Sequence, residues 1–309
     1  MKILLAGSNE LADAIAEYLL QLEWATLVGV VGSAGAVGAR AKAAKIPAYS
    51  PSKVVRSGAD ILIAAEAPAA HHAAWAKSAR LGGLHVHLSL LPDHTGTDPV
   101  RWSILDGDAE CGVTLHYITA EPYGGNVLAQ EREEIKGTHD AAELEEAMRG
   151  LARDKLVMVL HALDKINALP GTPQKGSSRR DHDAPPPPER ARLDFTRPMA
   201  EVHRQVAAFC HPYGGARCRL GGKPLAIWKA VPLPEKPNPK ISQDTFTARD
   251  FKGPKEPGAL VDGPEGARGV RCGCGGIMHL IALQLEPDEG GHRPAGVELL
   301  TGVTALESA

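Results

Sequence analysis

The chain contains few aromatic residues, which make up 4% of its 309 positions, although 43% of the residues are hydrophobic. We therefore expect cores built from Ala, Val, Leu and Ile. Cysteine is also scarce, because the five cysteines form no even framework and a chain of this length needs none. This pattern excludes a small disulfide-stabilised protein and favours the reducing cytoplasm as its location.

Long apolar runs are missing too. No run reaches the roughly 18 residues that a membrane-spanning helix requires. The first 20 residues, MKILLAGSNELADAIAEYLL, could be mistaken for a signal peptide, but polar and acidic residues from Asn9 to Glu17 interrupt them. No small-residue cleavage site follows a continuous apolar core, so we expect neither a membrane segment nor a secretion signal.

Two common ligand-binding motifs are absent from the sequence. The segment AGSNELA, residues 6–12, offers one glycine where a dinucleotide-binding fingerprint needs three, and no Walker-type phosphate loop is present. The chain also lacks a large excess of charge of one sign. Its formal net charge is −3, which neither recruits nor excludes a polyanion.

The sequence does contain an alternation of short apolar runs and helical patterns. The apolar runs predict strands at 2–7, 26–33, 59–65, 83–89 and 109–119. This alternation predicts an open, mostly parallel α/β sheet of Rossmann-like form. Ligands bind such sheets beyond the carboxyl ends of the strands, which places Ser8–Glu10, Glu66 and the loop 89–96 at one edge.

The chain divides where its composition changes. A long helix is predicted over 138–166, with Thr138 as its N-cap. The following segment, 171–197, holds charges, Gly, Ser and four consecutive prolines, which is typical of an extended linker. We therefore predict a first domain over 1–170 and a second over 198–309. One helix and several short strands spaced by Gly and Pro predict that the second domain is β-rich and barrel-like.

The fourth predicted strand carries two histidines. Residues two apart in a strand share a face, so His85 and His87 point the same way, and Ser89 would extend that face. Pro92 then ends the strand, and Gly96 permits a tight turn.

Three interpretations of this histidine pair fit the sequence. The two residues could be satisfied members of the core. They could be metal ligands, since His-x-His on a strand is a respectable metal geometry. A third ligand would then come from one of four residues: His116, Asp98, His94 or Glu66. Finally, one histidine could do acid–base chemistry while the other orients or polarises the substrate.

The segment HVHLSLLPDHTGTDPVRWSILDGDAECGVTLHYI, residues 85–118, resembles the active-site segment of the folate-dependent formyltransferases, and most of all that of the methionyl-tRNA formyltransferases. In the family this segment has the form Asn-x-His-x-Ser-x-Leu-Pro-x-x-x-Gly, then a helix ending in Gly-Asp, then Thr-Gly-Val-Thr. The chain matches it at His87, Ser89, Leu91, Pro92, Gly96, Gly107, Asp108, Gly112, Val113 and Thr114. Beyond the linker, ARLDFTRPMAEVHRQVAAF resembles the segment that leads into the family's C-terminal domain.

The resemblance implies transfer of a formyl group from 10-formyltetrahydrofolate to an amine. In the family an Asn and a His stabilise the oxyanion and assist proton transfer, and an Asp sets the charge of the His. This chain keeps the His as His87 but has His85 at the Asn position. Counted without a gap between Gly112 and Gly125, it has Tyr123 at the Asp position. A neutral imidazole can donate one hydrogen bond, so His85 could stand in for Asn, whereas tyrosine, with a pKa of about 10, cannot act as a carboxylate.

Other departures from the family concern substrate recognition. The family's basic loop after the second strand, which contacts tRNA, is shortened here. The loop after the third strand, which lies near the folate in the family, is AEAPAAHH and introduces Glu66. The segment 198–309 carries 13 Lys and Arg against 12 Asp and Glu, which is poor support for an RNA-binding surface. We therefore do not expect initiator tRNA as the acceptor.

These features together predict a divergent one-carbon transferase that takes a reduced folate as donor and a small or peptide-borne amine as acceptor. His87 would be the main acid–base or oxyanion group, His85 its partner, and Tyr123 a proton donor or a wall of the pocket. Substrate or folate contacts are expected from Ser89, Leu91, Gly96, Glu66, Asp98 and Glu121. The last two residues are also candidates for the missing carboxylate.

Two alternative functions place different chemistry at the same edge of the predicted sheet. One is another reaction, such as hydrolysis, at a metal site held by His85 and His87. The other is a catalytically inactive protein that serves in binding or as a scaffold.

Overall fold

The computed structural model describes residues 1–32, 34–51, 54, 57–67, 71–176, 180–235, 246–285, 300 and 304–308. They form two compact units. The N-terminal unit comprises Met1–Pro99, Glu110–Glu134 and Glu145–Ala184, and the C-terminal unit comprises Val100–Ala109, Ile135–Leu144 and Pro185–Ala309. The chain passes between the units for the last time after Ala184, within the segment 171–197. Domain boundaries at 170 and 198 stay a prediction. None of the described helices has the length and apolar character needed to cross a membrane.

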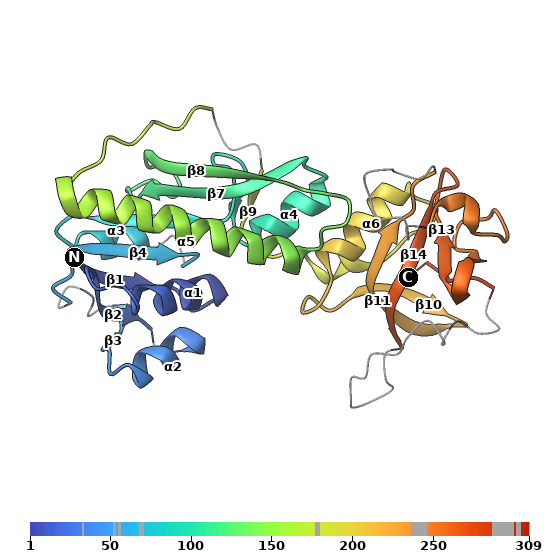
Figure 1. Cartoon of the computed structure of the whole chain (residues 1–309), viewed down its shortest axis with the longest axis horizontal. Coiled ribbons are helices and arrows are strands. Elements are labelled where there is room, and N and C mark those ends of the chain that lie inside the picture. The colour runs from blue at the N-terminus through green and yellow to red at the C-terminus, as the bar shows by residue number, and fades with distance from the viewer. Residues whose placement is uncertain are drawn as a thin grey trace. The chain divides into compact units, whose positions relative to one another are not determined.

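The N-terminal unit is built on a seven-stranded sheet with the order β3-β2-β1-β4-β5-β7-β8 (Figure 1). Its strands are β1 (Lys2–Ala6), β2 (Thr26–Val31), β3 (Ala48–Tyr49), β4 (Ile61–Ala65), β5 (Gly83–His87), β7 (Glu110–Tyr117) and β8 (Val127–Glu134). The strands from β3 to β5 pair in parallel, whereas β7 and β8 pair antiparallel with their neighbours. The predicted mostly parallel α/β sheet is therefore confirmed. Every residue of β4 and β5 is buried, as expected for apolar runs covered on both faces.

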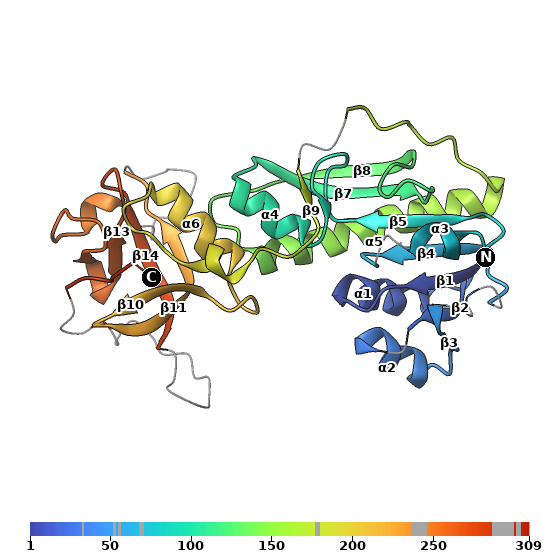
Figure 2. The same ribbon diagram turned by 180° about the vertical axis from the view of Figure 1, so that it is seen from behind.

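Five α-helices accompany these strands in the described part of the chain; the first four lie between strands, and the fifth follows β8. They are α1 (Glu10–Leu19), α2 (Gly35–Ala43), α3 (His72–Ala76), α4 (Pro99–Asp106) and α5 (Ala141–Ile166). Asn9 caps α1, because its Oδ1 accepts a hydrogen bond from the Ala12 amide at 3.0 Å. The helix α5 crosses one face of the sheet, which is in front in Figure 1 and behind in Figure 2.

The start of α5 differs from the predicted one. The helix begins at Ala141, so the prediction that Thr138 is its N-cap is wrong. Asp140 accepts a hydrogen bond from the Glu143 amide at 3.0 Å, and the Glu143 carboxylate accepts one from the Asp140 amide at 3.1 Å. This reciprocal pair satisfies two amides at the helix start, which a threonine outside the first turn does not do.

The C-terminal unit contains a curled, five-stranded antiparallel sheet with the order β10-β11-β14-β13-β12, accompanied by α6 (Met199–Ala208). Its strands are β10 (Ala216–Leu220), β11 (Lys223–Pro232), β12 (Leu260–Asp262), β13 (Arg268–Arg271) and β14 (Ile277–Leu285). Phe195, Val202 and Val206 pack with the inward side chains of this sheet in one buried core. The predicted β-rich, barrel-like character of this part of the chain is confirmed.

Candidate active site

The two histidines of β5 lie at the carboxyl end of that strand. β5 pairs in parallel with β4 and antiparallel with β7, which places His85 opposite His116 and His87 opposite Thr114. The ring centroids of His85 and His87 are 5.3 Å apart, and each residue is only 1% exposed. The shared face predicted from their spacing is therefore confirmed.

Two further histidines lie beside this pair. The ring centroid of His85 is 4.6 Å from that of His72 in α3 and 5.1 Å from that of His116 in β7. We call His72, His85, His87 and His116 the histidine cluster. The Tyr123 ring lies against it, with its centroid 4.9 Å from that of His87 and 5.4 Å from that of His85. The fold thus brings together the three residues predicted to be catalytic.

The hydrogen bonds of the cluster determine which nitrogen of His85 carries a proton. His116 Nδ1 lies 2.9 Å from the Tyr117 carbonyl oxygen, which can only accept, so Nδ1 of His116 is the protonated nitrogen. Its Nε2 then accepts from His85 Nδ1, at 3.1 Å. Neutral His85 therefore presents a bare lone pair at Nε2, and this buried atom has no hydrogen-bond partner among the described residues. In this arrangement His85 offers an acceptor, whereas the Asn that the resemblance leads us to expect at this position would offer an N–H donor.

Burial keeps the cluster neutral. It lowers the pKa of His87 to about 4, although the hydrogen bond from His87 Nε2 to the His94 carbonyl oxygen, at 2.9 Å, acts in the opposite direction. Burial also lowers the pKa of His116 to about 4, and it lowers that of His85 well below its usual value. At neutral pH these rings are therefore uncharged, and each has one N–H donor and one acceptor nitrogen.

Tyr123 is held by its backbone beside the rings. Its φ is +58°, and its carbonyl oxygen accepts a hydrogen bond from Gln174 Nε2. Burial raises the pKa of the Tyr123 phenol, against a smaller opposing effect of a hydrogen bond with the backbone of Gly96. The phenol therefore stays protonated at neutral pH and can donate, but it cannot replace a carboxylate.

The loop after β5 is fixed by its own polar contacts. Ser89 Oγ donates to the Asp93 carbonyl oxygen at 2.8 Å, and Thr114 Oγ1 donates to the Ser89 carbonyl oxygen at 2.7 Å. The Leu91 amide donates to Thr114 Oγ1 at 3.2 Å. A Cβ at Gly96, whose φ is +99°, would stand 2.1 Å from the His182 carbonyl oxygen. Ser89, Leu91 and Gly96 thus shape the loop, and their contacts with a ligand stay a prediction.

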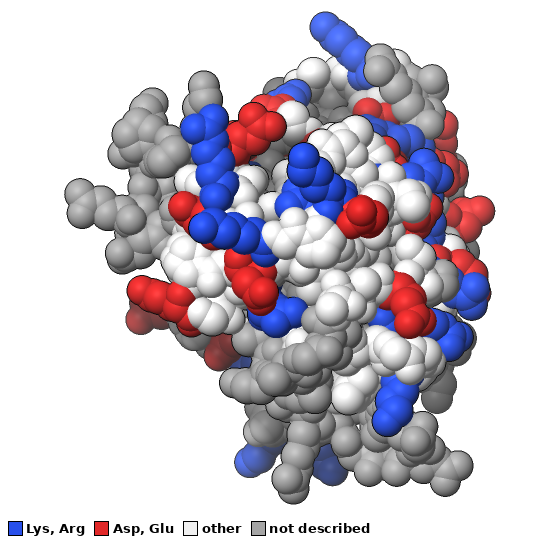
Figure 3. Space-filling model, turned by 90° about the vertical axis from the view of Figure 1, so that its right-hand side faces the viewer, with Lys and Arg blue, Asp and Glu red and all other residues white. Residues whose placement is uncertain are grey.

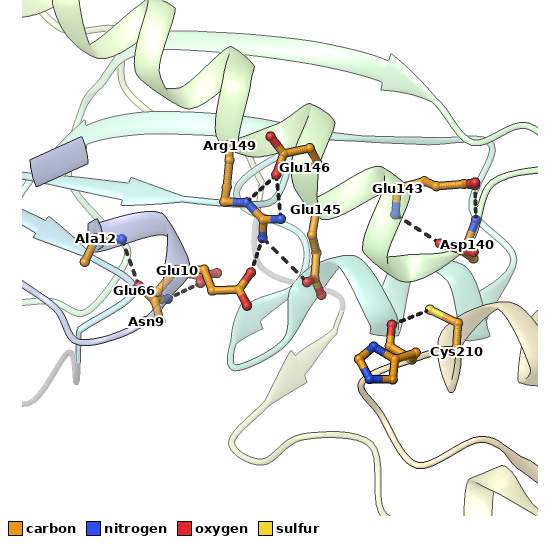
Figure 4. Close-up of polar contacts among 11 residues, drawn as sticks. Asn9, Glu10, Ala12, Glu66, Asp140, Glu143, Glu145, Glu146, Arg149 and Cys210 are labelled. Atoms are coloured by element: carbon orange, nitrogen blue, oxygen red, sulfur yellow. Dashed lines mark hydrogen bonds and ion pairs between the residues drawn. The ribbon is translucent and has the colours of Figure 1, made fainter. Parts of the chain in front are cut away.

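The predicted acidic residues differ in their surroundings. Glu66, which follows β4 with a φ of +46°, accepts a hydrogen bond from Asn9 Nδ2 at 2.6 Å, as Figure 4 shows. Burial raises the pKa of Glu66 to about 7, and the nearby Glu145 and Asp98 raise it further. This pairing confirms that the ends of β1 and β4 meet at one edge. Glu121 is exposed, and among the described residues no hydrogen bond or ion pair joins it to the histidine cluster.

A groove of about 710 Å³ lies beside Asn9, between side chains of α1 and α5. Arg149 in this groove forms ion pairs with Glu10 at 2.9 Å and with Glu146 at 2.8 Å, as drawn in Figure 4. Asp13 and Glu17 also line the groove. The lining thus holds four acidic residues against Arg149 and Arg153, and this negative excess disfavours a phosphate group there.

His85 and His87, the predicted metal ligands, each use one ring nitrogen in a hydrogen bond. Nδ1 of His85 and Nε2 of His87 each form a hydrogen bond within the protein. Over the part of the chain that the structure describes, neither residue belongs to a group of three His, Cys, Asp or Glu side chains close enough to share an ion. Among the described residues no third ligand joins His85 and His87, and metal binding by this pair stays a prediction.

Comparison with known proteins identifies the family. The profile of the formyl transferase domain matches residues 73–160, and that of the formyl transferase C-terminal domain matches residues 187–291. Together the two profiles cover more than half of the chain. The chain therefore belongs to the formyltransferase family. The methionyl-tRNA formyltransferase of Ralstonia nicotianae is 32% identical over 227 residues, which is 72% of this chain and 62% of that protein. The corresponding protein of Solibacter usitatus is 33% identical over 159 residues, 50% of this chain and 49% of that protein.

Solved structures share the fold. An N-formyltransferase from Helicobacter canadensis, in complex with folinic acid and dTDP-3-aminofucose, matches 91% of this chain and 98% of its own, with a TM-score of 0.64 and 17% identity. HypX from Aquifex aeolicus, in complex with tetrahydrofolic acid, matches 97% of this chain and 47% of its own, with a TM-score of 0.60 and 17% identity.

The sequence did not predict two features of the cluster. From the sequence, His72 is only the last residue of the altered loop AEAPAAHH, and His116 is only one of several possible third metal ligands. The antiparallel register of β5 and β7, which sets His85 opposite His116, determines their hydrogen bond. The sequence signal was the histidine in each of two predicted strands, but strand order and register had to be known to join them.

Proposed function

We propose that this chain transfers a formyl group from a reduced folate of the 10-formyltetrahydrofolate type to an amine. Membership of the formyltransferase family supports the reaction type. The observation that carries the proposal is the unpartnered Nε2 of His85, beside His87 and Tyr123 at the end of β5. A buried acceptor without a partner is costly, and it fits a substrate that presents an N–H group.

Each group has a distinct role in this proposal. The amine nitrogen would attack the formyl carbon of the folate. The bond from that carbon to the folate nitrogen then breaks, tetrahydrofolate leaves, and the proton lost by the amine passes to the departing nitrogen. His85 Nε2 accepts a hydrogen bond from the amine and so directs the nitrogen lone pair toward that carbon. The Tyr123 hydroxyl donates to the formyl oxygen as negative charge develops on it, a type of stabilisation that is often the largest contribution to catalysis. His87 remains anchored to the His94 carbonyl oxygen and orients both partners.

We propose a small or peptide-borne amine as the acceptor rather than initiator tRNA. The balanced charge of residues 198–309 supports this choice. Figure 3 adds that Lys and Arg side chains on the face it draws are interspersed with Asp and Glu. The N-formyltransferase from Helicobacter canadensis is in complex with the amino sugar dTDP-3-aminofucose, whereas the curated relatives are methionyl-tRNA formyltransferases. Both acceptor classes therefore belong in the test.

The test measures tetrahydrofolate release and formylated product for the full chain with 10-formyltetrahydrofolate. The acceptor panel contains nucleotide-linked amino sugars, small primary amines, an N-terminal peptide amine and methionyl-tRNA. His87→Ala should abolish turnover, while His161→Ala, at an exposed position on α5, should not change it. Absence of both folate binding and turnover would refute formyl transfer. Turnover with methionyl-tRNA alone would refute only the choice of acceptor.

A further inference from the structure

The C-terminal unit contains a hollow of about 270 Å³ whose walls carry four arginines. They come from three neighbouring segments: Arg190 from η3 (Pro188–Ala191), Arg192 and Arg197 from the stretch that follows it, and Arg204 from α6. Leu105 supplies an apolar wall. We call this feature the arginine hollow.

The acidic residues of the hollow neutralise only one of these arginines. Arg197 lies 3.8 Å from an Asp194 carboxylate oxygen and 3.6 Å from one of Glu201. Asp194 also accepts hydrogen bonds from the amide and hydroxyl of Thr196, at 3.0 Å and 2.6 Å. The third acid of the lining, Glu189, takes part in no ion pair among the described residues.

Three arginines of the lining are thus left without an acidic partner, and the Arg190 guanidinium lies 5.9 Å from the ring centroid of Trp102. Within the described ranges, no Asp or Glu lies at ion-pair distance from Arg190, Arg192 or Arg204. Positive groups gathered in this way repel one another unless an anion lies between them. A planar guanidinium also binds an oxyanion through two parallel N–H groups, so the arrangement favours a phosphate or carboxylate ligand.

Arg204 is the most enclosed of the three. Its Nε is buried and has no hydrogen-bond partner in the described part of the chain, although buried N–H groups are nearly always paired. Its guanidinium packs against Gly107, where a Cβ would stand 3.0 Å from Cζ of Arg204. Gly107 has a φ of +76°, which favours glycine, and a side chain there would displace the Arg204 guanidinium by a few tenths of an ångström.

The geometry of the hollow is fixed by α6. Gln205 Nε2 donates to the carbonyl oxygens of Arg190 and Arg192, at 2.8 Å and 3.0 Å. These bonds tie the backbone that carries two of the free guanidinium groups to the helix that carries the third. A site held in this way loses little conformational entropy when a ligand binds.

We propose that the arginine hollow binds a small phosphate ester. Three guanidinium groups match the charge and the three terminal oxygens of a phosphate dianion, whereas a single carboxylate would leave donors unused. The volume of about 270 Å³ accommodates a phosphate with a few carbon atoms, for which Leu105 offers an apolar contact. The proposal is independent of the formyl transfer, because every residue in it belongs to the C-terminal unit.

Calorimetry of the full chain with inorganic phosphate and glycerol 3-phosphate tests the proposal. We expect saturable binding of one equivalent, with glycerol 3-phosphate the tighter of the two. Arg204→Gln should weaken binding at least tenfold, and Arg204→Lys should weaken it less because the charge remains. Arg249→Gln, at an exposed arginine of η4 (Ala248–Asp250) in the same unit, should leave binding unchanged. Gly107→Ala should weaken binding by displacing the Arg204 guanidinium.

Thermal melting separates loss of the site from loss of the fold. Phosphate should raise the melting temperature of the unaltered chain and of Arg249→Gln but not that of Arg204→Gln. The proposal is overturned if neither probe binds saturably, or if Arg204→Gln and Arg249→Gln lose affinity equally. Binding of an RNA oligonucleotide through Arg204, with no binding of either small probe, would also overturn it and assign the hollow to a nucleic-acid backbone.

Discussion

At the scale of single residues, His116 decides the tautomer of His85. Its Nδ1 is bound to the Tyr117 carbonyl oxygen, so its Nε2 can only accept from His85. In His116→Leu we expect the Nδ1–H resonance of His85 to be lost from ¹⁵N NMR spectra and the transfer rate to fall about 10- to 100-fold. His161→Leu, on an exposed face of α5, is the control. An unchanged His85 signal in His116→Leu would contradict this assignment.

Two roles are predicted for Tyr123, as a hydrogen-bond donor to the substrate and as a wall of the pocket, and a substitution can distinguish them. If its hydroxyl stabilises the developing charge, Tyr123→Phe lowers kcat about 10²-fold or more, with little change in folate affinity, since the ring that contacts His87 remains. Single-turnover kinetics and folate titration measure the two effects separately. An unaltered kcat would assign the residue to the pocket wall alone.

The buried histidines also determine how stability changes with pH. The folded-state pKa values of His87 and His116 are about 4, below their usual 6.5. The unfolded chain therefore binds more protons in this range, and stability falls as the pH decreases from about 6.5 toward 4. Each histidine lowers the free energy of unfolding by about 3 kcal/mol once the pH lies below both its unfolded and its folded pKa.

Glu66 acts in the opposite direction, because its raised pKa of about 7 makes the folded state the stronger proton binder between 4.5 and 7. At least two histidines oppose one glutamate, so we expect net destabilisation by acid. Urea unfolding at several pH values measures this slope, which His116→Leu should reduce. A slope of the opposite sign would show that the cluster is not neutral in the folded state.

At the scale of elements, the loop after β5 depends on Gly96. An alanine there would adopt a positive φ and place its Cβ 2.1 Å from the His182 carbonyl oxygen. Gly82 provides a matched control, since its φ of +77° is also positive but no atom lies within 4 Å of a Cβ there. We expect Gly82→Ala to cost about 1–2 kcal/mol and Gly96→Ala at least about 2 kcal/mol more. Urea unfolding measures both, and equal costs would refute the close packing.

The elements predicted from the sequence are those with a strong apolar pattern. β1, β4 and β5 are short apolar runs whose residues are almost all buried, so the sequence alone identified them. β8 was not predicted, because this edge strand, VLAQEREE, contains no fully buried residue and offers no such run. The predicted start of α5 is wrong because Thr138 and Asp140, two residues that can cap a helix, stand close together in the sequence. Only the hydrogen bonds between Asp140 and Glu143 show which of the two lies at the helix start.

The candidate site was predictable only in part, for a related reason. The shared face of His85 and His87 follows from the two-residue period of a strand, which needs no knowledge of neighbours. The hydrogen bond between His85 and His116 depends on which strands pair and in what register. The contact of Asn9 with Glu66 depends on the order of β1 and β4. Local patterns therefore predicted candidate residues, while the protonation pattern that defines their chemistry required the assembled sheet.

At the scale of the whole molecule, the distribution of charge bears on the acceptor. A protein that binds tRNA through its phosphates shows an excess of basic residues and an affinity that falls steeply with salt. This chain has a net charge of −3, and acidic residues outnumber basic ones in the lining of the groove beside Asn9. We therefore expect bulk tRNA at micromolar concentration to leave formylation of a small amine unaffected at about 0.15 M salt.

Initial rates with and without uncharged tRNA, measured across a series of salt concentrations, test this expectation. A known methionyl-tRNA formyltransferase, assayed in parallel with its own substrate, supplies the positive control for inhibition. Inhibition of this chain that disappears as the salt concentration rises would show that a basic surface exists locally despite the balanced total charge. Since the −3 net charge sums over all residues, that result would return tRNA to the possible acceptors while leaving the roles of His85 and Tyr123 unchanged.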